Sequence, residues 1–480
     1  MKKFYVCTAI PYVNAKAHIG HAMDFLYADI LARYHRQQGE NVRFSIGTDE
    51  HGAKIAEKAE EQKVTPQAYT DQIVPTWVEF AKLANISNDY FIRTTHPEHE
   101  KRAGIIWKNL SEYIYKGSYA GWYCVGCEEY KTDTHVKDTN GVCPLHNRPY
   151  DKLEEENYFF RLSAFSDTVK EAIEAGKMKV VPEFRKKEIL NVLEEGLTDI
   201  SISRPSGKIS WGIPVPGDTT QVMYVWFEAL MNYITVLGYP DHADFKTYWP
   251  ADVQVVGKDI LRFHAAIWPS MLLGLKLPLP SVVYAHGHVS SGGQKMSKSL
   301  GNVIDPVEVI EKYGVDPFRY YLARHISSYD DGDFTWEKYT EVYNGELANE
   351  LGNAVSRIAT MVMKYQEGVI GDIPPAEHDT ASYREALELC RFDRALEDVW
   401  DQVRGLNQYI EEEKPWQVAK ENDPEHLQEV LVYMCGALLE IADLLVPFMP
   451  ETAEKIKHIF ADGVVRMPDG PLFPKEEKQA

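Results

Sequence analysis

Two short segments carry side chains that could neutralise a polyphosphate. His18 and His21 flank Gly20 near the start of the chain, and Lys295 and Lys298 lie in a segment rich in glycine and serine. Imidazoles at a helix N-terminus can donate hydrogen bonds to phosphate oxygens, and the helix dipole favours negative charge there. Two lysines three residues apart on a loop can reach a triphosphate. Either segment alone is typical of an ordinary surface, but the two together predict a nucleoside triphosphate site.

A cluster of soft metal ligands lies between these segments. Cys124 and Cys127 form one pair, and Cys143 and His146 form a second pair after fifteen intervening residues. This spacing is typical of a tetrahedral Zn²⁺ site. Four protein ligands leave no open position on the metal, so we expect a structural zinc ion. A redox role for the first pair is the alternative, and the matched second pair disfavours it.

The elements around the histidine segment alternate between strand and helix. Residues 3–10 and 41–48 are short apolar runs that predict buried strands, and residues 18–38 have apolar side chains at helical spacing. Strand, helix and strand with short links predict a βαβ unit and a parallel sheet. The same alternation resumes later, with predicted strands at 222–225, 253–256 and 281–284 and predicted helices at 226–236 and 258–273.

We therefore expect one α/β domain in two halves, interrupted by an insertion that holds the cysteines. Parallel sheets bind ligands at the carboxyl ends of their strands. The histidine segment follows the first predicted strand, and the lysine segment follows the strand at 281–284. After about Thr335 apolar residues recur in steps of three and four, which predicts a helix bundle.

Composition excludes several classes of protein. The 480 residues carry 51 Lys and Arg against 72 Asp and Glu, a net charge of −21. No apolar run reaches the ~18 residues of a membrane helix, and Pro11 and Asn14 interrupt the N-terminal apolar segment too early for a secretory signal. Six cysteines suit a reducing compartment. We expect a cytoplasmic protein with no membrane partner, whose acidity argues against non-specific DNA coating but not against a nucleic-acid partner.

The two phosphate segments resemble the HIGH-type and KMSKS-type motifs of class I aminoacyl-tRNA synthetases. Four flanking segments resemble the methionyl-tRNA synthetase family: AIPYVN at 9–14, GTDEHG at 47–52, YVWFEAL at 224–230 and GKDI at 257–260. The resemblance extends from Phe4 to about Phe448. It implies an α/β Rossmann-type parallel-sheet catalytic domain with a zinc-bearing connective insertion, followed by an all-α anticodon-binding helix bundle. The implied boundaries are 1–115 and 218–334 for the catalytic halves, 116–217 for the insertion and 335–480 for the anticodon-binding domain.

The resemblance also implies a reaction. ATP would activate methionine to methionyl-adenylate, and the methionine would pass to the 3′ end of initiator and elongator tRNA(Met). Positioning and charge neutralisation would supply most of the rate enhancement. The implied catalytic residues are His18, His21, Lys295 and Lys298. The implied ATP-binding residues are Gly20, Asp24, Gly257, Asp259, Val289 and Lys298. Mg²⁺ would accompany ATP through phosphate oxygens and water.

A methionine site follows from the same resemblance. Asp49 and the Ile10 carbonyl would hold the ammonium group. The implied side-chain pocket consists of Tyr12, Trp226, Ala229, Leu230, Tyr233, Ile260, His264 and Trp268. Without the resemblance we would interpret these residues as ordinary core. Their hydroxyl and imidazole groups could contact the thioether, adding to the ~1–3 kcal/mol by which an apolar pocket distinguishes one methylene.

The helical half supplies the implied anticodon contacts. Asn353 and Arg357 lie on one helix face because they are four residues apart. Trp416 follows Pro415, which favours the first turn of a helix. Amide, guanidinium and indole groups can bond base edges and stack on an unpaired base. The chain lacks the appended C-terminal module through which some relatives dimerise, so we expect a monomer.

Three alternatives stay open on the sequence alone. A synthetase for Leu, Ile or Val would carry a larger editing insertion than the roughly hundred residues available here. A small-molecule adenylyltransferase would not need the helical half. An inactive RNA-binding paralogue would not need His18, His21, Lys295 and Lys298.

Overall fold

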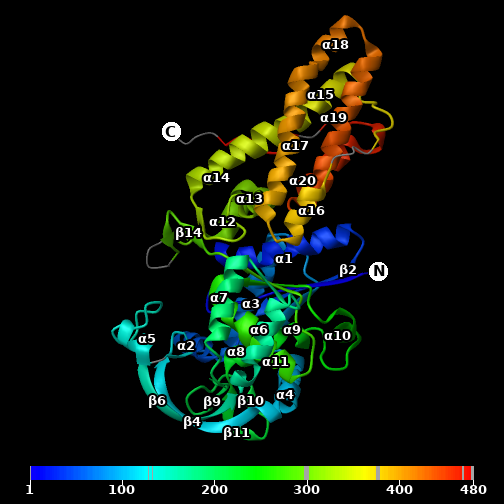
Figure 1. Ribbon diagram of the computed structural model, residues 1–480. Coiled ribbons are helices and arrows are strands. Elements are labelled where there is room, and N and C mark those ends of the chain that lie inside the picture. The colour runs from blue at the N-terminus through cyan, green and yellow to red at the C-terminus, as the bar shows by residue number, and fades with distance from the viewer. Residues whose placement is uncertain are drawn as a thin grey trace. The chain divides into compact units, whose positions relative to one another are not determined.

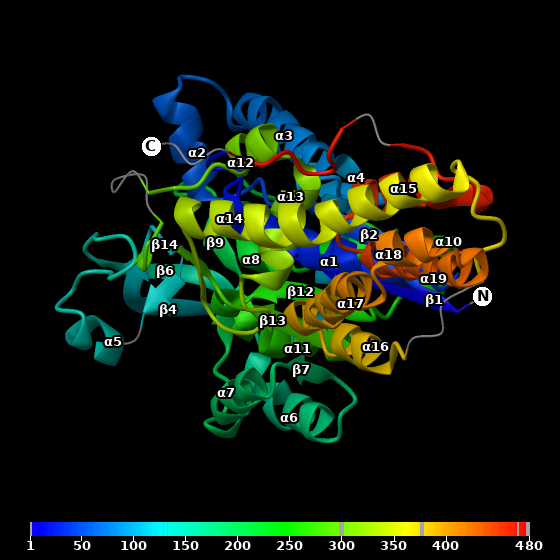
Figure 2. The same cartoon turned by 90° about the horizontal axis from the view of Figure 1, so that it is seen from above.

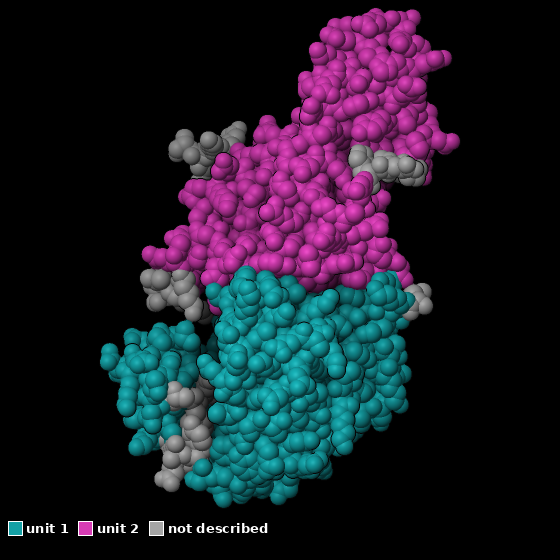
Figure 3. Space-filling view, viewed as in Figure 1, with its two compact units in different colours: residues 1–17, 40–82, 87–285 teal, residues 18–39, 83–86, 286–480 magenta. Residues whose placement is uncertain are grey.

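The computed structural model describes residues 2–127, 129–131, 133–296, 302–374, 379–467 and 470–476. The chain forms two compact units, coloured separately in Figure 3. Unit 1 comprises residues 1–17, 40–82 and 87–285, and unit 2 comprises residues 18–39, 83–86 and 286–480. Among the described residues, no helix combines the length and the hydropathy that crossing a bilayer requires.

Unit 1 is built on a six-stranded sheet in the order β3-β2-β1-β12-β13-β7. The strand β1 pairs in parallel with β2 and β12, β2 with β3, and β13 with β7. A sheet covered on both faces needs strands that are apolar throughout, and β1 and β12 are almost wholly buried. The strands are β1 (Lys3–Thr8), β2 (Asn41–Thr48), β3 (Tyr90–Arg93), β7 (Lys179–Val181), β12 (Val253–Gly257) and β13 (Val282–His286). The predicted parallel sheet is therefore confirmed.

Two sequence expectations differ from this sheet. The run 222–225 was expected to be one of its strands, but β11 (Asp218–Met223) pairs antiparallel with β9 (Ser203–Pro205) and β10 (Pro214–Val215) in a separate sheet. Its first half is polar and exposed, which a sheet covered on both faces does not tolerate. The strand β7, which lies within residues 116–217 and pairs with β13, was not expected from the sequence.

The helices of unit 1 connect and flank these strands. The predicted helix 226–236 is two short helices, and the predicted helix 258–273 begins with a 3₁₀ turn at Lys258–Ile260 and a π-helical turn at Phe263–Ile267. The helices are α2 (Ala53–Glu61), α3 (Pro66–Leu83), α4 (Pro97–Asn109), α5 (Asp133–Asp138), α6 (Ser166–Glu174), α7 (Glu183–Glu194), α8 (Val225–Ala229), α9 (Asn232–Thr235), α10 (Ala243–Tyr248) and α11 (Trp268–Gly274).

A long antiparallel ribbon carries the cysteine cluster. The strands β4 (Ile114–Cys124) and β6 (Asp151–Phe160) pair from Ile114 opposite Phe160 to Tyr123 opposite Asp151. Figure 1 shows the two strands curving together through unit 1. The edge strands are β5 (Glu129–Lys131) and β8 (Ile200–Ser201). Cys124 is the last residue of β4, so the cluster lies where the ribbon ends.

Unit 2 joins one N-terminal helix to a mostly helical C-terminal half. A small sheet is formed by β14 (Val289–Ser291), β15 (Gln294–Lys295) and β16 (Gly332–Phe334). The helix α14 continues through a π-helical stretch, Tyr343–Gly352, into α15, and Figure 2 shows them as one rod. The helices are α1 (Ile19–Gln37), α12 (Pro306–Tyr313), α13 (Val315–Arg324), α14 (Trp336–Val342), α15 (Asn353–Gln366), α16 (Ala381–Glu388), α17 (Phe392–Glu413), α18 (Pro415–Glu421), α19 (Pro424–Leu445) and α20 (Pro450–Phe460). The predicted helix bundle is confirmed.

One fully buried arginine ties α1 to the rest of unit 2. The Arg319 guanidinium on α13 donates to the Asp29 carboxylate on α1 at 2.7 Å. Its remaining N–H groups donate to the carbonyls of Ala84, Asn85, Pro447 and Phe448 at 2.8–3.3 Å. The guanidinium thereby links α1, the segment 83–86 and the chain after α19.

Candidate functional site

Two histidines cap the helix that was predicted to face a phosphate. The Nδ1 atom of His18 accepts from the Gly20 N–H at 3.1 Å, and the Nδ1 atom of His21 accepts from the His18 N–H at 3.3 Å. The two rings stack with centroids 3.7 Å apart and 28° between their planes. An accepting Nδ1 assigns the proton of each neutral ring to Nε2. The donating nitrogen of each neutral ring is therefore Nε2.

Gly20 allows this arrangement because it has no side chain. A Cβ at this position would lie 2.9 Å from Cε1 and 3.1 Å from Nδ1 of His18. Both distances are shorter than an ordinary van der Waals contact. The glycine thus lets the His18 ring fold over the first turn of α1, a role that the sequence did not indicate. The predicted contact between Gly20 and ATP stays a prediction.

The other predicted nucleotide residues of unit 2 lie near the end of β13. The Asp24 carboxylate on α1 pairs with His286 Nε2 at 2.9 Å, and His286 Nδ1 donates to the Gly287 carbonyl at 2.8 Å. Val289 is buried at the start of β14, and Lys295 ends β15. Lys298 lies outside the described residues. Asp24 is therefore held by a histidine that sequence reasoning missed.

Asp333, which the sequence did not indicate as a site residue, fixes the residues that precede Lys295. The Asp333 carboxylate accepts from the Ser290 hydroxyl at 2.6 Å and from the Gly293 N–H at 2.8 Å. These bonds tie β14 and the glycine turn to β16. Nothing in the local sequence marks Asp333, because its partners lie about forty residues away.

Several of the predicted nucleotide and methionine residues of unit 1 lie at the carboxyl ends of its parallel strands. Gly257 ends β12 and Asp259 follows it, and a Cβ at Gly257 would lie 2.8 Å from the Asp259 carboxylate. The segments that follow β1 and β2 run side by side: the Asp49 N–H donates to the Pro11 carbonyl at 2.9 Å, and Tyr12 forms a parallel bridge with Asp49. The structure therefore brings Ile10, Tyr12 and Asp49 together at the carboxyl end of the sheet. Asp49 is only 2% exposed.

The predicted methionine-pocket residues form two aromatic groups in unit 1. In the first, Tyr233 donates its hydroxyl to His264 Nε2 at 2.6 Å, and His264 Nδ1 donates to the Ile260 carbonyl at 2.9 Å. Burial lowers the pKa of His264 to about 4, so the ring is neutral at physiological pH. The Trp268 ring lies 5.8 Å from the Tyr233 ring. This group presents a fixed hydroxyl–imidazole pair on an apolar wall.

Trp226 organises the second aromatic group. Its ring stacks on Phe263 with centroids 4.1 Å apart and meets the Tyr12 ring edge-on at 6.0 Å. Trp226 and Leu230 also line a pocket of about 210 Å³, and Ala229 ends the same short helix, α8. Phe263 was missed, because an aromatic residue in an apolar helix reads as core.

The soft-ligand cluster has the geometry of a tetrahedral site. The Sγ atoms of Cys127 and Cys143 are 3.6 Å apart, and each lies 3.5 Å from Nδ1 of His146. The ligand atoms of these residues and Cys124 all lie within 4.8 Å of one another. Tetrahedral zinc with Zn–S bonds near 2.3 Å places two sulfurs about 3.8 Å apart. The four residues could therefore hold a metal ion.

A neighbouring glycine fits this cluster. A Cβ at Gly126 would lie 2.4 Å from Cγ of His146. The glycine lets the loop between the first two cysteines approach the imidazole. Cys124 and Cys143 are buried with Val136 and Tyr150 in a small separate core.

Two of the predicted anticodon residues meet at one pocket in unit 2. Arg357 and Trp416 line a pocket of about 350 Å³, with the guanidinium carbon 5.9 Å from the centre of the Trp416 ring. Arg357 also forms an ion pair with Glu411 at 2.6 Å. Asn353 is exposed at the start of the same helix, α15. The indole and guanidinium offer a stacking surface beside a hydrogen-bonding group.

Comparisons with known proteins agree on one family. The family model described as tRNA synthetases class I (M) matches residues 4–152 and 147–359. The methionine–tRNA ligase of Streptomyces coelicolor is 43% identical over 95% of this chain and 89% of its own length. That of Brucella melitensis is 40% identical over 96% of this chain and 92% of its own length.

Solved structures give the same result. The Mycobacterium tuberculosis methionyl-tRNA synthetase in complex with methionyl-adenylate superposes with a TM-score of 0.93 at 36% identity, covering 99% of this chain and 100% of that chain. The apo form of the same protein gives a TM-score of 0.86 at 32% identity, covering 99% of each chain. The expected fold class is confirmed.

Proposed function

The chain belongs to the class I methionyl-tRNA synthetase family and is an ATP-dependent methionine–tRNA ligase, and from this premise we propose which of its residues carry out the reaction. In the first step a methionine carboxylate oxygen attacks the α-phosphorus of ATP, and pyrophosphate leaves. In the second step a ribose hydroxyl at the 3′ end of tRNA(Met) attacks the acyl carbon, and AMP leaves. We propose that both initiator and elongator tRNA serve as acceptors.

The reciprocal histidine cap is the observation that carries the assignment of the first step. We assign His18 and His21 to the phosphates, because each Nδ1 accepts a hydrogen bond in the cap, which makes Nε2 the donating nitrogen of each ring. Donors fixed in advance cost little reorganisation when charge develops in the transition state. Lys295 and Lys298 would supply positive charge to the same phosphates. Gly20, Asp24, Gly257, Asp259 and Val289 would hold the nucleoside.

The methionine site would use both aromatic groups of unit 1. Asp49 offers its carboxylate to the ammonium group together with the Ile10 carbonyl. We propose that methionine packs its side chain against Trp226, Tyr233, His264 and Trp268, with Tyr12, Ala229, Leu230 and Ile260 completing the pocket. Because Tyr233 and His264 are bound to one another, the pocket needs no water to satisfy them.

Two metal ions would support this function. Zn²⁺ bound by Cys124, Cys127, Cys143 and His146 would stabilise the fold of the connective insertion, since four protein ligands close the coordination shell. Mg²⁺ would enter with ATP and bind mainly phosphate oxygens and water. No disulfide joins any of the six cysteines, all of which are described, and this suits the reducing cytoplasm that we propose as the location.

The helical half would recognise the anticodon. Asn353 and Arg357 would bond base edges, and Trp416 would stack on an unpaired base. The domain boundaries at 1–115, 116–217, 218–334 and 335–480 stay predictions, and a monomeric state is a prediction that sedimentation can test. Similarity to methionine–tRNA ligases at 40–43% identity over most of the chain disfavours another synthetase or an adenylyltransferase.

ATP–pyrophosphate exchange with single amino acids tests the proposal. We expect exchange with methionine and not with leucine, isoleucine or valine. His21→Asn is the sharpest variant, because the Asn amide oxygen can replace Nδ1 in the cap while the Nε2–H donor is lost. We expect exchange to fall about 10²–10³-fold, the usual cost of one transition-state donor, with little change in the unfolding temperature. Undiminished exchange in His21→Asn would contradict the role given to the imidazole.

A further inference from the structure

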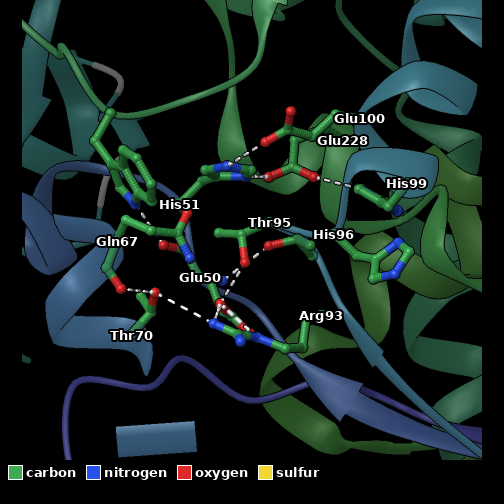
Figure 4. Close-up of polar contacts among 12 residues, drawn as sticks. Glu50, His51, Gln67, Thr70, Arg93, Thr95, His96, His99, Glu100 and Glu228 are labelled. Carbon is green, nitrogen blue, oxygen red and sulfur yellow. Dashed lines mark hydrogen bonds and ion pairs between the residues drawn. The ribbon is translucent and has the colours of Figure 1, made fainter. Parts of the chain in front are cut away.

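A fully buried carboxylate in unit 1 has no part in the reaction proposed above. Glu228 on α8 lies between two imidazoles, with Oε1 2.9 Å from His51 Nδ1 and Oε2 2.9 Å from His99 Nε2. On its other side His51 Nε2 lies 3.6 Å from the half-exposed Glu100 carboxylate. Figure 4 shows Glu228 bridging the two histidines. His99 Nδ1 contacts the Thr235 hydroxyl at 2.8 Å, which completes the chain of contacts.

The bridge from Glu228 to His51 is an ion pair at neutral pH. Burial alone would lower the pKa of His51, but the charge of Glu228 and hydrogen bonds to Glu100 and Glu228 raise it to about 10. Burial would raise the pKa of Glu228, but the charge and hydrogen bonds of His51 and His99 lower it. A buried ion pair adds little net stability over apolar residues of the same volume. The ion pair instead determines geometry, because a charged hydrogen bond fixes the positions of both side chains.

The pair joins the two ends of the proposed methionine site. His51 lies two residues after Asp49, in the turn that follows β2, and Glu228 lies two residues after Trp226 and directly before Ala229. The bond between them holds the turn with the ammonium anchor against the helix with the side-chain pocket. It spans 177 positions of the sequence, so no local interaction duplicates it.

The same turn is held from two further sides. The Trp211 ring lies 5.3 Å from the His51 ring, its Nε1 donates to the Glu50 carbonyl at 2.6 Å, and its carbonyl accepts from the Gly52 N–H at 3.1 Å. The Glu50 carboxylate, also drawn in Figure 4, accepts from Arg93 at 2.7 Å and from Thr95 at 2.6 Å. Asp49 thus immediately precedes two residues whose side chains are both anchored.

We propose that Glu228 is a positioning residue for methionine recognition, which acts through His51 to set the distance between the Asp49 carboxylate and the Trp226–Ala229 wall of the pocket. This inference rests on the proposed methionine site. Glu228 does not touch substrate. It keeps the Asp49 carboxylate close to the α-carbon of a methionine whose side chain packs against α8. Loss of Glu228 therefore moves the ammonium contact away from the side-chain contact, and methionine must make both at once.

Glu228→Gln in the full-length enzyme tests the proposal, because it keeps the shape and removes the charge. A misplacement of the order of 1 Å can cost up to about 100-fold, so we expect the KM for methionine in ATP–pyrophosphate exchange to rise about 10–100-fold while the KM for ATP stays within twofold. 4-(Methylthio)butanoate lacks the ammonium group. Its inhibition constant should change much less than the KM for methionine.

Glu346→Gln is the matched control. The Glu346 carboxylate in unit 2 also accepts from a histidine, His325 Nε2 at 2.9 Å, and from Arg324 at 3.1 Å. A general effect of removing a paired carboxylate would appear there too, whereas we expect an unchanged KM for methionine. His51→Gln provides a second route if Glu228→Gln does not fold, and the same selective rise in KM is expected.

The outcomes separate the inference from the function on which it rests. Absence of methionine-dependent exchange in the unaltered enzyme would overturn the proposed function itself. Exchange in the unaltered enzyme, with Glu228→Gln raising both KM values alike or neither, would overturn only the positioning role. Equal weakening of methionine and its deaminated analogue would also overturn it, because the ammonium anchor would then be unaffected.

Discussion

Gly20→Ala should lower the rate of the reaction while leaving the stability of the protein almost unchanged, because the added methyl group displaces the His18 ring. A Cβ there would lie 2.9 Å from Cε1 of His18, whereas carbon atoms in contact are normally about 3.5–4.0 Å apart. The His18 ring must therefore move by about 0.6–1.1 Å, and this movement disturbs its stacking on the His21 ring at 3.7 Å. A displacement of this size at a reacting group can lower the rate by up to about 100-fold.

The stability of Gly20→Ala should change little. Alanine is favoured over glycine inside a helix by about 1 kcal/mol, and loss of the His18 cap costs about 1 kcal/mol. The two effects nearly cancel. We expect kcat for ATP–pyrophosphate exchange to fall about 10–100-fold while the free energy of unfolding stays within about 1 kcal/mol of its original value.

Gly405→Ala is the control for this experiment. Gly405 lies on α17, and nothing approaches the position of its absent Cβ within 4 Å. Alanine there should stabilise the protein by about 1 kcal/mol and leave exchange unchanged. If Gly20→Ala exchanges at more than half the original rate, the position of the His18 ring does not limit catalysis. If it loses activity only by unfolding, the reasoning is equally refuted.

Three further outcomes are expected. Metal analysis should find one zinc ion per chain, and Cys143→Ser should lose it and lower the unfolding temperature; a zinc-free protein of full stability would contradict the metal site. Trp416→Ala should raise the KM for tRNA about 5–150-fold, from about 1–3 kcal/mol of stacking, with exchange unchanged; an equal effect on exchange would argue against an anticodon role. The protonated form of His51 is favoured by folding, because its pKa is raised from 6.5 to about 10. Its contribution to stability is thus complete below pH 6.5 and is lost as pH rises towards 10; the free energy of unfolding should fall more between pH 7 and 9.5 than in His51→Gln, and parallel curves would contradict the ion pair.

Local patterns in the sequence predicted the elements that are determined locally. The first strand was expected at 3–10 and is Lys3–Thr8, and the first helix was expected at 18–38 and is Ile19–Gln37. Both rest on apolar runs or helical spacing within a single segment. The cysteine cluster was equally predictable, since the spacing of its ligands is itself the signal.

Elements that depend on distant partners could not be predicted in this way. The three-residue strand β7 acquires its role only from pairing with β13, about a hundred residues later. Val222 reads as part of a buried strand, but the polar residues before it place β11 in an antiparallel sheet. Glu228 and His51 carry no periodic signal, because a buried ion pair leaves no pattern in either segment.

The cap on α1 is an intermediate case. The sequence predicted a helix that begins near His18, but Ser, Thr, Asp and Asn are the usual N-cap residues. That an imidazole takes this place, and that the next imidazole returns the bond, appears only in the structure. The sequence therefore located these two rings without indicating which nitrogen each can offer to a ligand.

The guanidinium of Arg319 has a consequence for how the histidine-bearing helix tolerates change. All five of its N–H groups have acceptors within 3.3 Å, and such a fork cannot be reproduced by a lysine ammonium. A small shift of the chain after α19 is therefore transmitted to α1 by the rigid, planar guanidinium of Arg319, because this group bonds both segments. The helix that bears the two imidazoles is thus anchored near its middle, at Asp29, so a change remote from the first turn can still alter how that turn is presented.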